Sequence, residues 1–125
     1  MRIAILTALA AFVLPSAAAA TGGFDCRATD RSGLRISGVT GRGIVTPLVS
    51  ARLSAPGRMI STSGERPQAA IGQSWIDSRE IRLDLVDPQA MRFEARLRAR
   101  ITLRNQATGT LVRAGRTHPV RCTIE

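Results

Sequence analysis

Residues 80–104 read EIRLDLVDPQAMRFEARLRARITLR, and this stretch decides the fold class. From residue 91 onward, every odd position is apolar and every even position is charged or polar. A period of two is typical of a β-strand that has one side on a core and the other in water. A helix is the alternative, because Ala, Arg, Leu and Glu favour helices and Asp87-Pro88 resembles a helix start. However, a helix turns about 100° per residue and would spread these apolar side chains around its circumference, so the pattern predicts a strand.

A second alternating run, residues 80–86, ends at Asp87-Pro88-Gln89, which is typical of a turn. We therefore predict a central hairpin over about residues 80–104, folded back around Pro88. The register that we predict makes three opposite-charge pairs: Asp84 with Arg92, Arg82 with Glu94, and Glu80 with Arg96. It points Phe93 and Leu97 into the core and leaves Arg98 and Arg100 without an acidic partner on the preceding strand.

The chain opens with a predicted signal peptide, residues 1–20. A positively charged second residue precedes an apolar run, residues 3–14, that is too short to span a bilayer. Four alanines, residues 17–20, then offer a cleavage site. Cys26 is not preceded by the small residues of a lipobox, so we expect a soluble product. The prediction is one β-domain, residues 21–125, in the periplasm of a Gram-negative bacterium or secreted from the cell.

All side-chain positive charge in the chain comes from arginine, because lysine is absent. Without the predicted leader, 17 arginines face 9 acidic residues, which gives a net charge of +8. Such a charge attracts anions in general. We exclude nucleic acid as the partner because the protein is expected to be exported. In addition, only Phe24, Trp75 and Phe93 remain as platforms for stacking on bases.

Two cysteines, Cys26 and Cys122, lie near the two ends of the predicted domain. In an oxidising compartment such a pair usually forms a disulfide, which here would join the first strand to the last. The chain has no Cys-x-x-Cys motif and a single histidine, His118, so the expectation is no metal site and no cofactor.

Between the cysteines, short alternating runs are separated by glycine and proline every 8–12 residues or so. This spacing predicts an all-β fold, either a small antiparallel β-sandwich or a barrel. Residues 38–43 are glycine-rich and are expected to form a loop. Trp75 is expected to plug the core, and Pro119 is expected to place the last strand, or its beginning, at a sheet edge. No motif is specific enough to name a family.

The strongest candidate site is a set of arginines on the polar side of the long strand: Arg96, Arg98, Arg100 and Arg104. Neighbouring positions on one side of a strand lie about 7 Å apart, within the Debye length of about 8 Å, so these guanidinium groups repel one another. The same groups would attract an anionic envelope component or an acidic protein. The alternative is that they only keep the domain soluble. Arg113, Arg116 and Arg121 are further members of the candidate patch.

The leading hypothesis is therefore an exported, non-enzymatic binding or accessory protein with an arginine-rich face. A second hypothesis is a hydrolase or hydrolase inhibitor that acts through a loop near Trp75 or His118, with Ser74 or another serine as nucleophile and Asp77 as the residue that orients the histidine. Gly72-Gln73-Ser74 lacks the second glycine of a nucleophile elbow, so no catalytic residue is assigned. A third hypothesis is a structural domain without a ligand.

Overall fold

The structure is a computed structural model that describes residues 22–41 and 47–125, in which all regular secondary structure is β-strand. This confirms the predicted all-β class. The predicted signal peptide lies outside the described residues. The strands are β1 (Gly22–Ala28), β2 (Arg35–Thr40), β3 (Leu48–Ala55), β4 (Arg58–Ser61), β5 (Ala70–Ile76), β6 (Glu80–Val86), β7 (Phe93–Leu103), β8 (Gln106–Arg113) and β9 (Arg116–Ile124).

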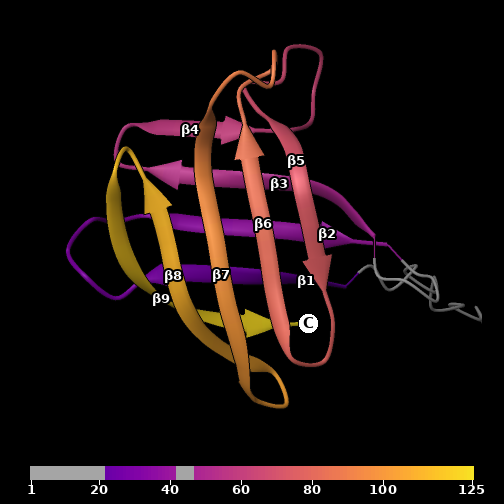
Figure 1. Cartoon of the computed structure of the whole chain (residues 1–125), viewed down its shortest axis with the longest axis vertical. Helices are drawn as coiled ribbons and strands as arrows, with labels where there is room; N and C mark the ends of the chain where they lie inside the picture. Colours follow the sequence, from indigo (N-terminus) through magenta and orange to yellow (C-terminus); the bar gives the residue numbers. More distant parts are fainter. Residues whose placement is uncertain (1–21, 42–46) are drawn as a thin grey trace, which may run out of the picture.

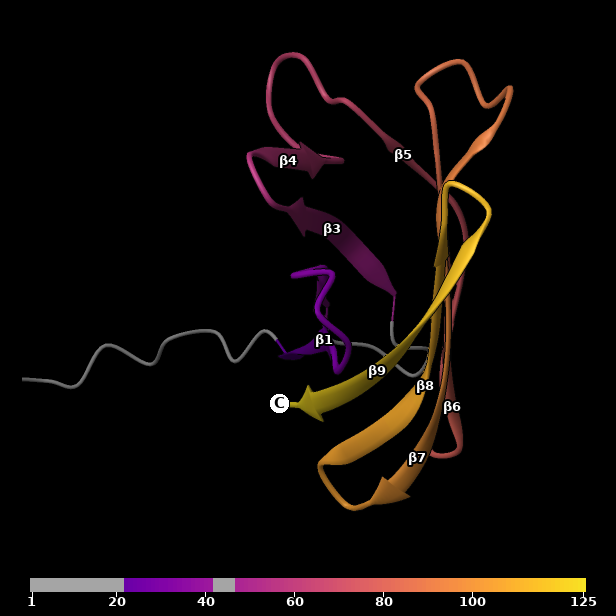
Figure 2. The same cartoon turned by 90° about the vertical axis from the view of Figure 1, so that its left-hand side faces the viewer.

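The strands form one antiparallel sheet in the order β4-β3-β2-β1-β9-β8-β7-β6-β5. Each strand pairs with its neighbours in sequence, except that β9 returns to pair with β1 and no ladder joins β4 to β5. The sheet folds over on itself, so that β5–β8 cross in front of β1–β4 at a steep angle (Figure 1). Seen from the side, β9 passes from one layer to the other (Figure 2). The result is a nearly closed barrel, with β3 and β5 in contact at the open seam.

The core lies between the two layers and is made by one side of each strand. Cross-strand pairs connect Ile60, Leu53, Ile36, Cys26 and Cys122 in a single inward-facing line, and all five are buried. Because the side chains of a strand alternate, the residues between these positions face outward. The predicted disulfide is confirmed: Cys26 and Cys122 lie directly opposite each other on β1 and β9, with Cα atoms 4.0 Å apart.

The central hairpin is present as β6 and β7, but the predicted register is wrong by four residues. Glu80 lies opposite Arg100 and Asp84 lies opposite Arg96. The connection is longer than a fold-back at Pro88 because the Asp87 carboxylate holds a loop. It accepts hydrogen bonds from the N–H groups of residues 91 and 92 at 2.7 and 2.8 Å. The loop therefore takes up residues that we had assigned to the ladder.

The inward side of β7 is shorter than the sequence pattern suggests. Leu97 is fully buried, but Phe93 is 57% exposed and Met91 is 82% exposed, so the prediction that Phe93 enters the core is wrong. The ladder between β6 and β7 has a register irregularity between Leu85 and Val86, where Leu85 pairs with Ala95 but Val86 pairs with Phe93. This irregularity reverses the side of β7 to which the Phe93 side chain points. The ring consequently lies on the arginine side of β7, where the Arg96 guanidinium stacks 4.5 Å from its centroid.

Three smaller expectations are also corrected. Trp75 does not plug the core, because it lies on the exposed face of β5, and its indole N–H donates to Asp77 at 2.9 Å. Gly38 belongs to β2 and not to a loop. The last strand as a whole is central, between β1 and β8, but its beginning, residues 116–119, belongs to the ladder with β8 alone, so only the expectation for the whole strand is wrong. Pro119 is tolerated there because it precedes the part of β9 that pairs with β1, and its carbonyl accepts a hydrogen bond from Thr29 N–H at 2.9 Å.

Candidate anion-binding site

Of the four arginines predicted as an anion site, three lie on β7 and Arg104 lies in the turn after it, and two of the four are already partnered. Arg98 Nη1 lies 2.8 Å from Asp84 Oδ1, and Arg96 Nε lies 3.4 Å from the same oxygen. Asp84 is only 4% exposed, so this ion pair is partly shielded from water. Arg100 and Arg104 are exposed and, among the described residues, have no carboxylate within ion-pair distance.

The expectation that Arg98 lacks an acidic partner is therefore wrong, and the reason is the register. Moving β7 by four residues places Arg98 opposite Arg82 and within reach of Asp84. Arg82 in turn contacts Glu80 at 3.0 Å. Between Glu80 and Asp84, the outer side of β6 and β7 thus holds Arg82, Arg96 and Arg98 in ion pairs with two carboxylates. Such a network stabilises the sheet but leaves little charge there for a ligand.

Positive charge accumulates instead along a line of cross-strand pairs that runs across five neighbouring strands. Arg100 on β7 lies opposite Thr108 on β8, and Thr108 lies opposite Arg121 on β9. Arg121 lies opposite Arg27 on β1, and Arg27 lies opposite Arg35 on β2. We call Arg100, Arg121, Arg27 and Arg35 the arginine row. At about 4.8 Å per strand, the row is about 19 Å long.

The centre of the arginine row is a pair of like charges in direct cross-strand opposition, Arg27 and Arg121. Both follow from the disulfide, because each is the neighbour in sequence of a paired cysteine. The Arg27 side chain is 69% exposed. Directly opposed like charges are unfavourable in a sheet, so the fold maintains this arrangement at a cost to stability.

Asp25 is the acidic residue that lies closest to the centre of the row. Its carboxylate forms a two-pronged ion pair with Arg35, at 2.8 Å to Nε and 2.6 Å to Nη2. The Arg27 guanidinium is 3.9 Å away, at the limit of an ion pair. The carboxylate raises the pKa of Arg35, which stays charged. Asp25 therefore pairs mainly with Arg35, and the positive charges of Arg27 and Arg121 remain available to bind an anion.

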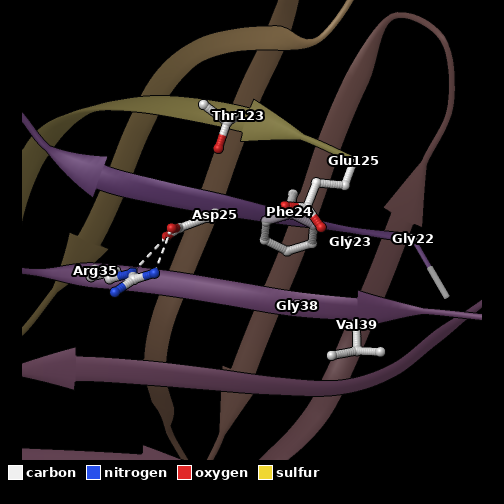
Figure 3. A pocket seen from close by; sticks show the side chains of 9 residues that line it. All are labelled: Gly22, Gly23, Phe24, Asp25, Arg35, Gly38, Val39, Thr123 and Glu125. Atoms are coloured by element: carbon white, nitrogen blue, oxygen red, sulfur yellow. Dashed lines mark hydrogen bonds and ion pairs between the residues drawn. The ribbon is translucent and has the colours of Figure 1, made fainter. Parts of the chain in front are cut away.

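Two shallow hollows flank Asp25 on the outer surface of β1 and β9. One, of about 400 Å³, lies beside Arg27 and Arg121. The other, of about 280 Å³, lies beside Arg35 and is drawn in Figure 3, where the Arg35 side chain extends towards Asp25. Gly23 supplies part of its floor, where a Cβ would come within 2.5 Å of a carbonyl oxygen of β2. The hollows let anionic groups approach the arginines from the outside of the sheet.

The residues of the hydrolase hypothesis are not brought together. His118 Nδ1 lies 2.8 Å from Asp30 Oδ2, so its partner is Asp30 and not Asp77. Hydrogen bonds from Ser32 and His118 lower the pKa of Asp30 to about 2. Asp77 instead accepts hydrogen bonds from Trp75 and from two backbone N–H groups, which lower its pKa. Trp75 is on β5 and His118 on β9, with three strands between them.

Arg27 and Arg35 were not predicted as members of the site, although the position of Arg27 beside Cys26 could have indicated it. Once Cys26 is paired with Cys122 on antiparallel strands, their neighbours Arg27 and Arg121 must lie opposite each other. Arg35 had no such signal, because its position depends on the length of the turn between β1 and β2.

Within residues 22–41 and 47–125, no group of His, Cys, Asp and Glu side chains is arranged to hold a metal ion. The same residues include no helix with the length and hydrophobicity needed to cross a bilayer. No protein-family model, curated protein or solved structure matches the chain.

Proposed function

We propose that this protein is a non-enzymatic binding or accessory protein of the cell envelope that holds an acidic polysaccharide along the arginine row. The observation that supports this proposal best is the cross-strand opposition of Arg27 and Arg121. An anion that binds between the two guanidinium groups relieves their repulsion. The bound anion therefore also stabilises the sheet.

The shape of the row indicates the kind of partner. The four residues follow a path about 19 Å long across neighbouring strands on the outer side of the sheet, and the hollows beside them are shallow. Enclosed pockets suit small molecules, whereas a line of exposed charges suits an extended chain with carboxylate or phosphate groups at regular intervals. Guanidinium groups bind such oxygens with two parallel hydrogen bonds.

The Cys26–Cys122 disulfide supports a location outside the reducing cytosol, where an envelope polysaccharide is accessible. Anionic lipid is the competing partner, because a membrane surface also carries phosphate groups. A lipid surface is wide and flat, and it would be expected to select a broad patch of basic residues. The narrow row favours the polysaccharide.

The test compares binding of polygalacturonate, neutral dextran and phosphatidylglycerol vesicles to the oxidised protein at physiological salt. We expect binding to polygalacturonate and none to dextran. In the variant Arg27→Gln/Arg121→Gln, the loss of two contacts of about 1 kcal/mol each weakens binding about 30-fold. The control variant Arg58→Gln/Arg66→Gln removes the same charge from two exposed arginines outside the row, and we expect less than a threefold change.

Equal losses in both variants would show that only net charge matters, and the row would then have no special role. Retention on phosphatidylglycerol vesicles with no binding of polygalacturonate would replace the polysaccharide by a membrane surface. Unchanged binding in Arg27→Gln/Arg121→Gln would refute the site.

A further inference from the structure

A second basic cluster lies at the end of the barrel where three turns meet: β1–β2, β3–β4 and β8–β9. They surround a hollow of about 510 Å³. The lining includes three apolar residues, Leu34, Ala55 and Pro56, and three basic residues, Arg113, Arg116 and His118. This hollow is separate from the arginine row, since no residue of the row lines it.

The three basic residues lie on the core-facing side of their strands. Arg113 follows the buried Leu111 by two positions on β8, and His118 precedes the buried Val120 by two positions on β9. Arg116 pairs with Arg113 at the end of the same ladder. Because alternate residues of a strand share one side, all three point towards the space between the layers, beyond the end of the apolar core. Arg113 and His118 are half-buried there, whereas Arg116 is exposed at the mouth of the hollow.

The turn between β8 and β9 fixes the two arginines directly opposite each other. Ala114 and Gly115 both have positive φ, 49° and 73°, as a tight two-residue hairpin turn requires. Arg113 and Arg116 are the closing pair of this turn. Among the described residues, neither has a carboxylate within ion-pair distance. Two guanidinium groups are thus held side by side at the hollow, with their repulsion uncompensated.

His118 is held in a fixed orientation. Its side chain is only 14% exposed, and its Nδ1 lies 2.8 Å from Asp30 Oδ2. Asp30 is itself positioned by the Ser32 N–H, which donates to its other oxygen at 3.0 Å. An ionised carboxylate only accepts hydrogen bonds, so Nδ1 carries the hydrogen in this contact. Nε2 is therefore the ring nitrogen that remains for a ligand.

We propose that this hollow binds a small organic anion, a carboxylate or a phosphate ester carried on an apolar body. Arg113 and Arg116 bind the anionic oxygens with charge-assisted hydrogen bonds. His118 Nε2 contacts a hydroxyl or acid hydrogen of the ligand, and the apolar body packs on Leu34 and Pro56. The site is independent of the polysaccharide proposal, because it uses other residues on the opposite side of the sheet.

The test uses four probes that separate the two parts of the ligand: hexanoate, hexyl phosphate, inorganic phosphate and hexanol. Binding is followed by calorimetry and by backbone amide shifts of the oxidised full domain. We expect hexanoate or hexyl phosphate to bind, with the largest shifts at residues 32–34, 55–57 and 113–118. Inorganic phosphate is expected to bind at least about tenfold more weakly, and hexanol not detectably. Whichever hexyl compound binds more tightly identifies the anionic group.

The decisive variant is Arg116→Glu, which places a carboxylate directly opposite Arg113. The new pair is attractive, so the hairpin is not destabilised, and the carboxylate occupies the place of the ligand's anion. We expect binding to weaken by at least about 30-fold. Arg121→Glu is the matched control, because it makes the same charge change opposite Arg27, at a site outside the hollow. It is expected to leave binding of the hexyl compound within about threefold of wild type.

Four outcomes would overturn the proposal, and the first three concern how the binding responds to the variants and probes. They are equal losses in the two variants, shifts centred outside the three turns, or hexanol binding as tightly as the hexyl anions. Absence of binding by both hexyl anions to the wild-type protein would also overturn it. A melting curve of each variant shows whether the fold is retained at the assay temperature. Asp30→Asn provides a second variant, because it releases His118 without touching either arginine, and a drop in affinity of several-fold is expected.

Discussion

Replacing Arg121 by glutamate is expected to stabilise the fold while it damages the arginine row. Arg121 lies directly opposite Arg27, at a distance of about 5 Å between Cβ atoms. The guanidinium groups splay into water, so we take a charge separation of about 7 Å. Coulomb's law with a dielectric constant of about 80 then gives a repulsion of about 0.6 kcal/mol. Reversing one charge changes repulsion into attraction, so the free energy of unfolding should rise by about 1 kcal/mol.

For a domain of this size, about 1 kcal/mol corresponds to a rise in the melting temperature of about 4–6 °C. The assay is thermal unfolding of the oxidised protein, followed by circular dichroism at low salt and again at about 1 M salt, where the Debye length falls to about 3 Å. We expect the gain to appear at low salt and to shrink at high salt. Arg121→Gln removes only the repulsion and should give about half the effect. A melting temperature below wild type in both variants at low salt would refute the idea that the pair is repulsive.

Three further predictions test other parts of the structure. Gly109→Ala should cost more than about 3 kcal/mol, because its Cβ would lie 2.5 Å from Ala99 Cα, whereas Gly41→Ala, with its nearest neighbours at 3.4 Å, should change stability little in urea unfolding. Asp87→Ala removes the acceptor for two loop N–H groups and should speed hydrogen exchange of both amides, so unchanged exchange rates would contradict the role of this carboxylate. The pKa of Asp30 is lowered to about 2 from 3.8, so its contribution to stability is present above about pH 4 and lost as the pH falls through about 2. Asp30→Asn should therefore flatten the fall in melting temperature over that range, and an identical fall in wild type and variant would count against the hydrogen bonds of Asp30 with Ser32 and His118.

The parts of the fold that could be predicted from sequence were those governed by local alternation and covalent chemistry. The alternation around Leu97 identified a strand, and two cysteines in a small domain with a predicted signal peptide identified the disulfide. The register of β6 and β7 could not be predicted, because charge pairing does not distinguish the alternatives well. The observed register also places Glu80 opposite Arg100 and Asp84 opposite Arg96, which are opposite-charge pairs. The length of the loop between β6 and β7 is set by hydrogen bonds that the Asp87 carboxylate accepts.

The candidate site was predicted only in part, for a related reason. Arg100 and Arg121 were named from sequence, but the arginine row depends on which strands are neighbours in the sheet. Arg35 enters the row through the ladder between β1 and β2, which no local pattern specifies. Conversely, Arg98 is an obvious candidate in the sequence, yet its charge is largely neutralised by Asp84 from another strand. Long-range pairing therefore decides which arginines are available.

The position of the disulfide has a mechanical consequence. The two ends of the described domain lie side by side, since Gly23 and Glu125 exchange backbone hydrogen bonds at 3.4 and 2.8 Å. A force that pulled these ends apart would unzip β1 from β9 one hydrogen bond at a time, beginning at this end. Unzipping would stop at Cys26 and Cys122 after residues 22–25 and 123–125 had peeled away. The oxidised domain can thus lengthen by only about 24 Å before the covalent link takes up the tension, and residues 22–25 and 123 must also leave their pairing with β2 and β8.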